Sequence, residues 1–228
     1  MLDQAGAIAY TISVWALPAL TAITLHEAAH GYVAEQFGDD TARQAGRVSL
    51  NPLRHVDPVG TVLLPIVLLL VSPLVFGYAK PVPVRFFRLN PRRIGIAAVA
   101  LAGPAMNLLL ALLAALLLHL VPSVPVGGRW VADNLVNALW INVLLALLNL
   151  LPLLPLDGGR VLYAALPHGW ARRWASTERY GFPVLLAGLV AVPLAASALG
   201  AELPIFRWIL GEPAQYVVSI IVRMVGLS

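Results

Sequence analysis

Long apolar runs constrain this chain more than any other feature of its sequence. The clearest two cover residues 94–120 and 131–156, where Leu and Ala dominate. Roughly 20 apolar residues in a helix are enough to cross the hydrocarbon core of a bilayer. The other apolar runs cover residues 5–25, 59–77, 182–199 and 203–227. We therefore expect an all-α, polytopic transmembrane helical bundle with about five to six membrane segments.

Composition and charge agree with a membrane protein. Hydrophobic residues make up 60% of the chain and charged residues only 11%, whereas about 25% of a soluble domain is charged. The net charge of +4 could indicate nucleic-acid binding, but the arginines lie between the apolar runs and form no basic stripe or tail. We expect a lipid bilayer and no nucleic acid as partner. The absence of cysteine excludes a thiol nucleophile and thiolate metal ligands.

We expect one integral membrane domain over residues 1–228, because no repeat, linker or soluble segment interrupts the apolar pattern. The first apolar run begins without a basic residue, so it lacks the charged region of a cleaved signal peptide. We expect it to remain in the mature protein. It continues to Phe37 and is predicted to form one long helix that ends near Gly38.

Two segments differ from plain spanning helices. Two prolines interrupt the run 59–77, and basic residues flank both of its ends. A span should separate basic from less basic loops, so this run either spans the membrane, dips in and returns, or lies along the interface. The segment 78–85 is too rich in proline for a helix, and its alternating valines and prolines predict an extended or β-like edge.

Residues 26–30 read His-Glu-Ala-Ala-His at the end of the first apolar run. On a helix these two histidines, His26 and His30, lie on one face and can bind a single ion. Neutral imidazole suits zinc, and Glu27 between them can act as a general base. The alternative is an interfacial cluster where the helix leaves the membrane. The motif lacks the metzincin extension, because Val33 and Gln36 occupy its Gly and His positions.

A catalytic zinc needs a third protein ligand, and elimination among the remaining histidines and acids favours Asp157. This residue directly follows the apolar run 139–156, in a stretch that contains two prolines and two glycines. Such a stretch breaks a helix, and broken backbone at membrane depth is tolerated only where protein or a wet cavity satisfies it. A carboxylate beside the break is therefore a candidate ligand. The alternative is an interfacial aspartate in an Asp-Gly turn.

These motifs together resemble those of the site-2 protease family of intramembrane metalloproteases. The resemblance rests on the motif at 26–30, on Asn149, Pro152 and Asp157-Gly158-Gly159, and on Gly103-Pro104-Ala105-Met106-Asn107. The stretches 51–58 and 76–84 look like those of the small prokaryotic branch, and the resemblance covers most of residues 10–165.

The resemblance implies a membrane-embedded zinc, one per chain, held by His26, His30 and Asp157. It implies that Glu27 is the general base and that Asn149 positions the substrate or stabilises the oxyanion. It also implies transmembrane protein or peptide substrates and an integral protein of a prokaryotic cell membrane, with no particular oligomeric state.

Four more residues could carry chemistry. We interpret Asn107 as structural, bonding backbone groups freed by the Gly-Pro break, with substrate contact as the alternative. We interpret His55 as an interfacial loop residue, with a second metal site or substrate contact as alternatives. His119 is expected at an interface, and His168 in an exposed turn.

The predicted function is intramembrane peptide-bond hydrolysis by a zinc-activated water, with Glu27 as the base. One alternative is a membrane metal transporter, because intramembrane His and Asp also line ion paths. The other is a pseudoprotease that binds membrane helices without cleaving them.

Overall fold

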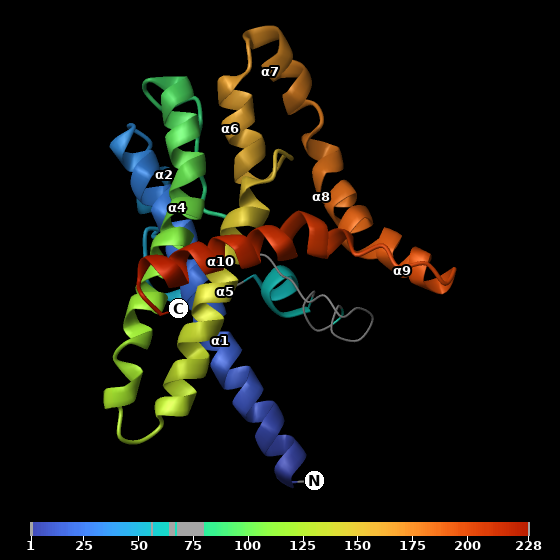
Figure 1. The fold of residues 1–228 in the computed structure, drawn as a ribbon. Coiled ribbons are helices and arrows are strands. Elements are labelled where there is room, and N and C mark those ends of the chain that lie inside the picture. The colour runs from blue at the N-terminus through green and yellow to red at the C-terminus, as the bar shows by residue number, and fades with distance from the viewer. Residues whose placement is uncertain (1, 56, 64–66, 68–79, 228) are drawn as a thin grey trace.

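Three long helices form the centre of the molecule in the computed structural model, which describes residues 2–55, 57–63, 67 and 80–227 (Figure 1). They are α1 (Leu2–Gln36), α4 (Arg92–Leu118) and α5 (Gly128–Leu150). Each is long and apolar enough to cross a membrane. The described residues contain no strand, so the expected all-α fold class is confirmed for this part of the chain.

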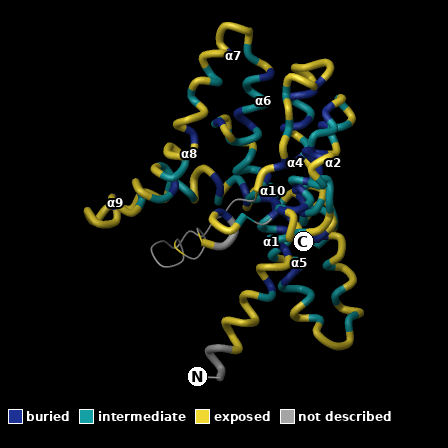
Figure 2. The backbone as a smooth tube through the Cα atoms, turned by 180° about the vertical axis from the view of Figure 1, so that it is seen from behind, coloured by how far each residue is buried: buried dark blue, intermediate teal, exposed yellow. Residues whose placement is uncertain are grey.

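A fourth candidate span is Glu178–Ala198. It consists of α8 (Glu178–Leu186), a π-helical turn (Ala187–Ala191) and α9 (Val192–Ala198). Most of its residues are exposed, and Figure 2 shows it as a largely yellow arm outside the bundle. Its apolar surface is therefore available to lipid.

The described part of the chain contains four candidate spans, fewer than the five to six segments expected from the sequence. The run 203–227 accounts for one difference. It forms a π-helical turn (Arg207–Gly211) that continues without a break into α10 (Glu212–Met224). Three charged residues, Arg207, Glu212 and Arg223, lie within this helix, and it is not among the candidate spans of the described residues. In Figure 1, α10 lies across the other helices. Residues 64–66 and 68–77 of the run 59–77 lie outside the described residues.

Small side chains allow the central helices to approach closely, as is common between helices in membranes. One buried cluster joins the second half of α4 to α5 and α10, through Ala111, Ala114, Ala115, Leu139, Val143, Ala214, Val218 and Ile221. A second cluster joins the end of α1 to the start of α4 and to α6 (Asp157–Ala165), through Ala34, Leu89, Ile96, Val99 and Ala164. The two clusters hold α4 between α1 and α5.

Short elements complete the described structure. They are α2 (Thr41–Gln44), α7 (His168–Ala175), a π-helical turn (Pro58–Leu63) and 3₁₀ turns at Pro52–Arg54 and Val121–Ser123.

Residues 80–85, the described part of the predicted extended segment, form neither a helix nor a strand. Lys80 and Val82 each precede a proline, which disfavours helical backbone. The Lys80 N–H donates to the His55 carbonyl at 2.9 Å, and the Val82 N–H donates to Glu27 Oε2 at 2.8 Å. The segment is thereby held against α1.

Asp39, just beyond α1, holds the far end of this segment. Its buried carboxylate accepts the Arg85 N–H and both the hydroxyl and the N–H of Thr41. Burial alone raises the pKa of Asp39, but these hydrogen bonds and the charge of Arg88 outweigh it, so the pKa lies below its ordinary value.

Candidate metal centre

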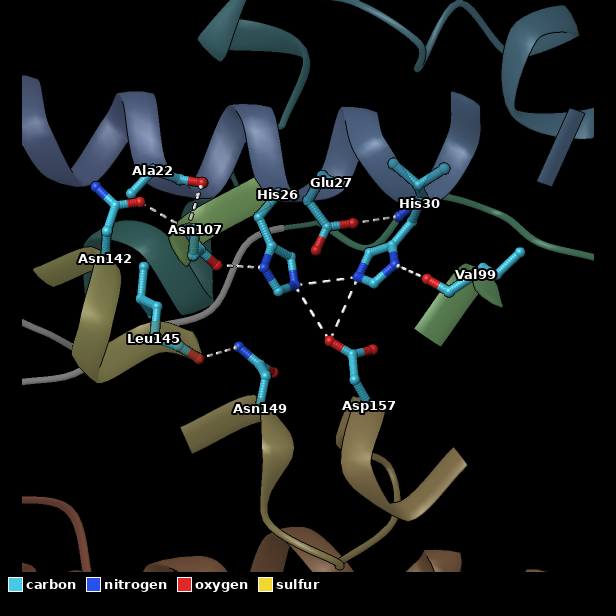
Figure 3. Close-up of polar contacts among 11 residues, drawn as sticks. Ala22, His26, Glu27, His30, Val99, Asn107, Asn142, Leu145, Asn149 and Asp157 are labelled. Carbon is cyan, nitrogen blue, oxygen red and sulfur yellow. Dashed lines mark hydrogen bonds and ion pairs between the residues drawn. The ribbon is translucent and has the colours of Figure 1, made fainter. Parts of the chain in front are cut away.

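His26 and His30 lie one turn apart on the same face of α1, and both side chains are buried. Their Nε2 atoms are 3.0 Å apart. Asp157, the first residue of α6, places Oδ2 3.3 Å from His26 Nε2 and 3.4 Å from His30 Nε2 (Figure 3). The three side chains selected from the sequence therefore converge on one point.

The geometry of this group fits a zinc ion. Tetrahedral zinc with bonds of about 2.0–2.1 Å separates neighbouring ligand atoms by about 3.3 Å, and the three observed separations are 3.0, 3.3 and 3.4 Å. Asp157 Oδ2 is buried and accepts no hydrogen bond from any described residue. Two imidazoles and one carboxylate also form a donor set that zinc accepts readily. The residues present therefore suit zinc by both spacing and chemistry.

Two groups on α4 contact the Nδ1 atoms of the two imidazoles. His26 Nδ1 is 2.6 Å from Asn107 Oδ1, and His30 Nδ1 is 2.7 Å from the Val99 carbonyl oxygen. Both partners can only accept, so each Nδ1 carries the proton and each Nε2 presents a lone pair toward Asp157. Partners of this kind orient histidine ligands in metal sites.

Gly103 of α4 forms the surface on which the two imidazoles rest. A Cβ atom added there would lie 2.5 Å from His26 Cε1, from His26 Nε2 and from His30 Nε2. Real Cβ contacts are essentially never that short, so only glycine allows both rings to occupy these positions. Two residues of the Gly-Pro-x-x-Asn motif thus support the centre. Gly103 leaves room for the two imidazoles, and Asn107 contacts Nδ1 of His26.

Two more glycines position Asp157. The chain turns between α5 and α6 over residues 151–156 and folds back against the start of α6. A Cβ at Gly158 would lie 2.2 Å from the Leu150 carbonyl oxygen, and one at Gly159 would lie 2.5 Å from the Leu153 carbonyl carbon. The close approach of backbone to backbone therefore requires the Gly-Gly pair after the aspartate.

Glu27 faces a cavity of about 710 Å³ that also contains the three convergent side chains. One of its oxygens accepts the Val82 N–H. The cavity wall is mainly apolar and includes Ile23, Val84, Phe86, Leu148, Phe182 and Leu185. A carboxylate, a potential metal site and an apolar wall therefore share one cavity.

Asn149 lines the same cavity but does not contact the three convergent side chains. Its Nδ2 donates to the Leu145 carbonyl one turn earlier in α5, at 3.0 Å (Figure 3).

Arg160, one turn after Asp157, also lines the cavity. Its guanidinium lies 4.7 Å from the centre of the Phe86 ring and 3.3 Å from Glu178 Oε1.

The remaining histidines lie outside the convergent group. His55 is buried, and its Nε2 is 3.0 Å from the Ser49 carbonyl oxygen. His119 ends α4 and contacts the Val225 carbonyl at 2.7 Å. His168 is exposed, with Nδ1 3.3 Å from a guanidinium nitrogen of Arg93.

The sequence alone does not reveal the roles of Gly103, Val99 and Asn142, and the hydrogen-bond partners of Asn107 differ from those expected. Asn107 bonds no backbone group of its own helix; its partners are His26, Asn142 and the Ala22 carbonyl. A usable signal was present, because Gly103 and Asn107 have the same i, i+4 spacing as the two histidines and therefore share one helix face. Val99 contributes only its carbonyl, which no side-chain pattern reveals.

Comparisons with known proteins agree with this centre. The family model described as "Peptidase family M50" matches residues 128–192. The Bacillus subtilis protein named "Putative zinc metalloprotease YwhC" is 42% identical over 189 residues, which is 79% of this chain and 81% of that protein. The protein named "Putative zinc metalloprotease Rip2" of Mycolicibacterium smegmatis is 29% identical over 190 residues, 83% of this chain and 70% of its own.

The protein of the same name from Mycobacterium tuberculosis is 32% identical over 168 residues, 73% of this chain and 60% of its own. No solved structure matches the chain. The match to the Bacillus protein covers most of both chains at substantial identity, and the family model includes both Asn149 and Asp157. The chain is therefore an integral membrane protein of peptidase family M50, the site-2 protease family.

Proposed function

We propose that this chain is an intramembrane zinc metalloprotease that hydrolyses peptide bonds in membrane-spanning protein substrates. The observation that carries the proposal is the convergence of His26, His30 and Asp157, 3.0–3.4 Å apart, in the cavity that contains Glu27. Membership of a metalloprotease family and four candidate spans support it. The cell membrane of a prokaryote is the proposed location, because the named relatives come from bacteria.

His26, His30 and Asp157 would hold one zinc ion per chain. Zinc bound there supplies a Lewis acid, which acidifies water and polarises the scissile carbonyl. The cavity wall is mainly apolar, and electrostatic interactions are stronger where the surroundings are less polar than water.

Glu27 is the proposed general base. Its carboxylate takes a proton from water as the water oxygen bonds to the carbonyl carbon. The carbon–nitrogen bond then breaks, and Glu27 returns the proton to the departing amine. The products are a carboxylate and an amine, and one water is consumed. Because the Val82 N–H binds only Oε2, Oε1 of Glu27 is left to exchange the proton.

Asn149 is the proposed donor to the developing oxyanion. Its amide nitrogen has two N–H groups, of which one is used by the Leu145 carbonyl. The second N–H can serve the substrate without loss of the first bond. A donor aimed at developing charge in a dry site contributes strongly to catalysis.

The segment 80–85 is the proposed docking edge for an unwound substrate. A substrate helix hides its peptide bonds in its own hydrogen bonds and must unwind before attack. Val84 lines the cavity and is partly exposed. We expect Val84→Asp to impair cleavage of a membrane substrate while zinc binding stays unchanged. Unaltered cleavage would exclude this edge.

The decisive experiment combines zinc analysis with cleavage of single-span substrates by purified protein, with and without a chelator. Glu27→Gln should retain zinc and lose cleavage, whereas Glu35→Gln, on the same helix beyond the cavity, should retain both. A zinc-loaded wild-type protein that cleaves no membrane substrate would favour the pseudoprotease. Zinc uptake into sealed vesicles without proteolysis would favour the transporter. An active Glu27→Gln protein would exclude Glu27 as the base.

A further inference from the structure

A chain of asparagine side chains runs through the bundle behind His26. Asn107 of α4 is 0% exposed and Asn142 of α5 is 2% exposed. Asn107 Oδ1 lies 2.6 Å from His26 Nδ1, and Asn107 Nδ2 donates to Asn142 Oδ1 at 2.8 Å (Figure 3). The chain therefore connects α5 to a candidate metal ligand on α1.

The backbone carbonyls of Ala138 and Ala22 determine which atom donates and which accepts in each hydrogen bond between these side chains. Asn142 Nδ2 donates to the Ala138 carbonyl at 2.8 Å, so Oδ1 of Asn142 faces Asn107. The Asn107 amide donates to that oxygen and to the Ala22 carbonyl at 3.3 Å. Carbonyl oxygens only accept, so rotation of the Asn107 amide by 180° would place its oxygen against two acceptors.

The orientation of Asn107 determines the tautomer of His26. Because the Asn107 amide group is turned toward the two carbonyl oxygens, its own Oδ1 faces the imidazole. An oxygen acceptor requires the proton on Nδ1 of His26, which leaves the Nε2 lone pair directed at Asp157. Nε2 is the atom that lies 3.3 Å from the Asp157 carboxylate.

The two histidines differ in how they are held. His30 is oriented by the main-chain carbonyl of Val99, which any residue at position 99 would supply. His26 is oriented by the side chain of Asn107, which is itself oriented by the side chain of Asn142. A substitution on α5 can therefore reach His26 but has no comparable path to His30.

We infer that Asn142 is a positioning residue, which acts through Asn107 to fix the tautomer and orientation of His26 and so raises the zinc affinity of a centre that it does not touch. This inference rests on the proposed zinc site. A purely structural asparagine would join the helices and contribute to stability, as buried polar side chains in membranes do. It would not change zinc affinity through Asn107.

Zinc affinity, measured by competition with a chromophoric chelator, tests the inference on the purified full chain. Loss of a partner that orients a metal ligand commonly lowers affinity about 10–100-fold, so Asn107→Leu should fall in that range. Asn142→Leu should lower affinity by up to about tenfold, because its effect is indirect. Asn142→Asp should restore near wild-type affinity, because a carboxyl buried there stays neutral and keeps one donor and one acceptor.

Asn137→Leu is the matched control. Asn137 also lies on α5 and donates to the Val14 carbonyl of α1 at 3.0 Å, but it belongs to no chain that reaches His26. We expect its zinc affinity to equal that of the wild type even if its melting temperature falls. In the double variant with Asn107→Leu, Asn142→Leu should lower zinc affinity no further.

The outcomes are separable. If the wild type binds no zinc, the proposed function and this inference both fail. If the wild type binds zinc and Asn142→Leu binds it equally well, the inference alone is wrong. Equal losses from Asn137→Leu and Asn142→Leu, or fully additive losses in the double variant, would also overturn it. If Asn142→Leu does not fold, Asn142→Ala replaces it in this test. An Asn142→Ala protein with the zinc affinity of the wild type would overturn the inference.

Discussion

Gly103→Ala adds a single methyl group at the surface that supports both imidazoles. The added carbon would lie 2.5 Å from atoms of both rings, whereas ordinary contact begins near 3.4 Å. Each ring would have to retreat by the difference, about 0.9 Å, while metal sites tolerate deviations of about 0.2 Å in ligand distance. We therefore expect zinc affinity to fall by more than about 100-fold, beyond the usual effect of losing an orienting partner.

The same substitution should not disrupt the helix. Alanine is favoured over glycine within a helix by about 1 kcal/mol, so far-ultraviolet circular dichroism of Gly103→Ala should match that of the wild type. Zinc content and chelator competition measure the effect on the centre. Gly188→Ala is the control, since nothing lies within 4 Å of a Cβ at that position. A Gly103→Ala protein that binds zinc normally and cleaves substrate would refute the packing argument.

Two further predictions concern the segment 80–85 and its anchors. Val82→Pro removes the N–H that binds Glu27, in a stretch that already holds prolines on both sides, so we expect a lower kcat with unchanged zinc content. Turnover equal to that of the wild type would exclude a role for this N–H. The lowered pKa of Asp39 predicts a stability contribution that is complete above about pH 4 and is lost as pH falls through the folded-state value. Below pH 5, the melting temperature of the zinc-free protein should therefore fall less steeply with pH in Asp39→Asn than in the wild type. An equally steep fall in both proteins would show that Asp39 does not contribute to stability.

The metal ligands could be selected from the sequence because their signals are local. A two-histidine motif needs only the 3.6-residue period of one helix, and Asp157 stands out because two prolines and two glycines interrupt an apolar run beside it. The bundle class could be selected for the same reason, since span length depends on consecutive residues alone. None of these inferences requires knowledge of which helices are neighbours.

The support of the centre depends on neighbours and could not be selected in this way. Asn142 looks like any polar residue in an apolar helix until α5 is placed against α4. Gly103 is needed because two rings from another helix lie against it, which is a property of packing. The last apolar run is long enough to suggest a span, but Arg207, Glu212 and Arg223 lie in the helix that it forms, and this helix is not among the candidate spans of the described residues.

The contact between α8 and the bend at residues 151–156 has a consequence for tolerance to mutation. A Cβ at Gly181 would lie 1.4 Å from the Leu154 carbonyl oxygen, so the outlying span touches this bend with bare backbone. Position 181 accordingly admits one amino acid, although glycine has no side chain and this position lies on a different helix from every proposed ligand. A saturation library should lose activity there as sharply as at the histidines, from steric exclusion instead of lost chemistry.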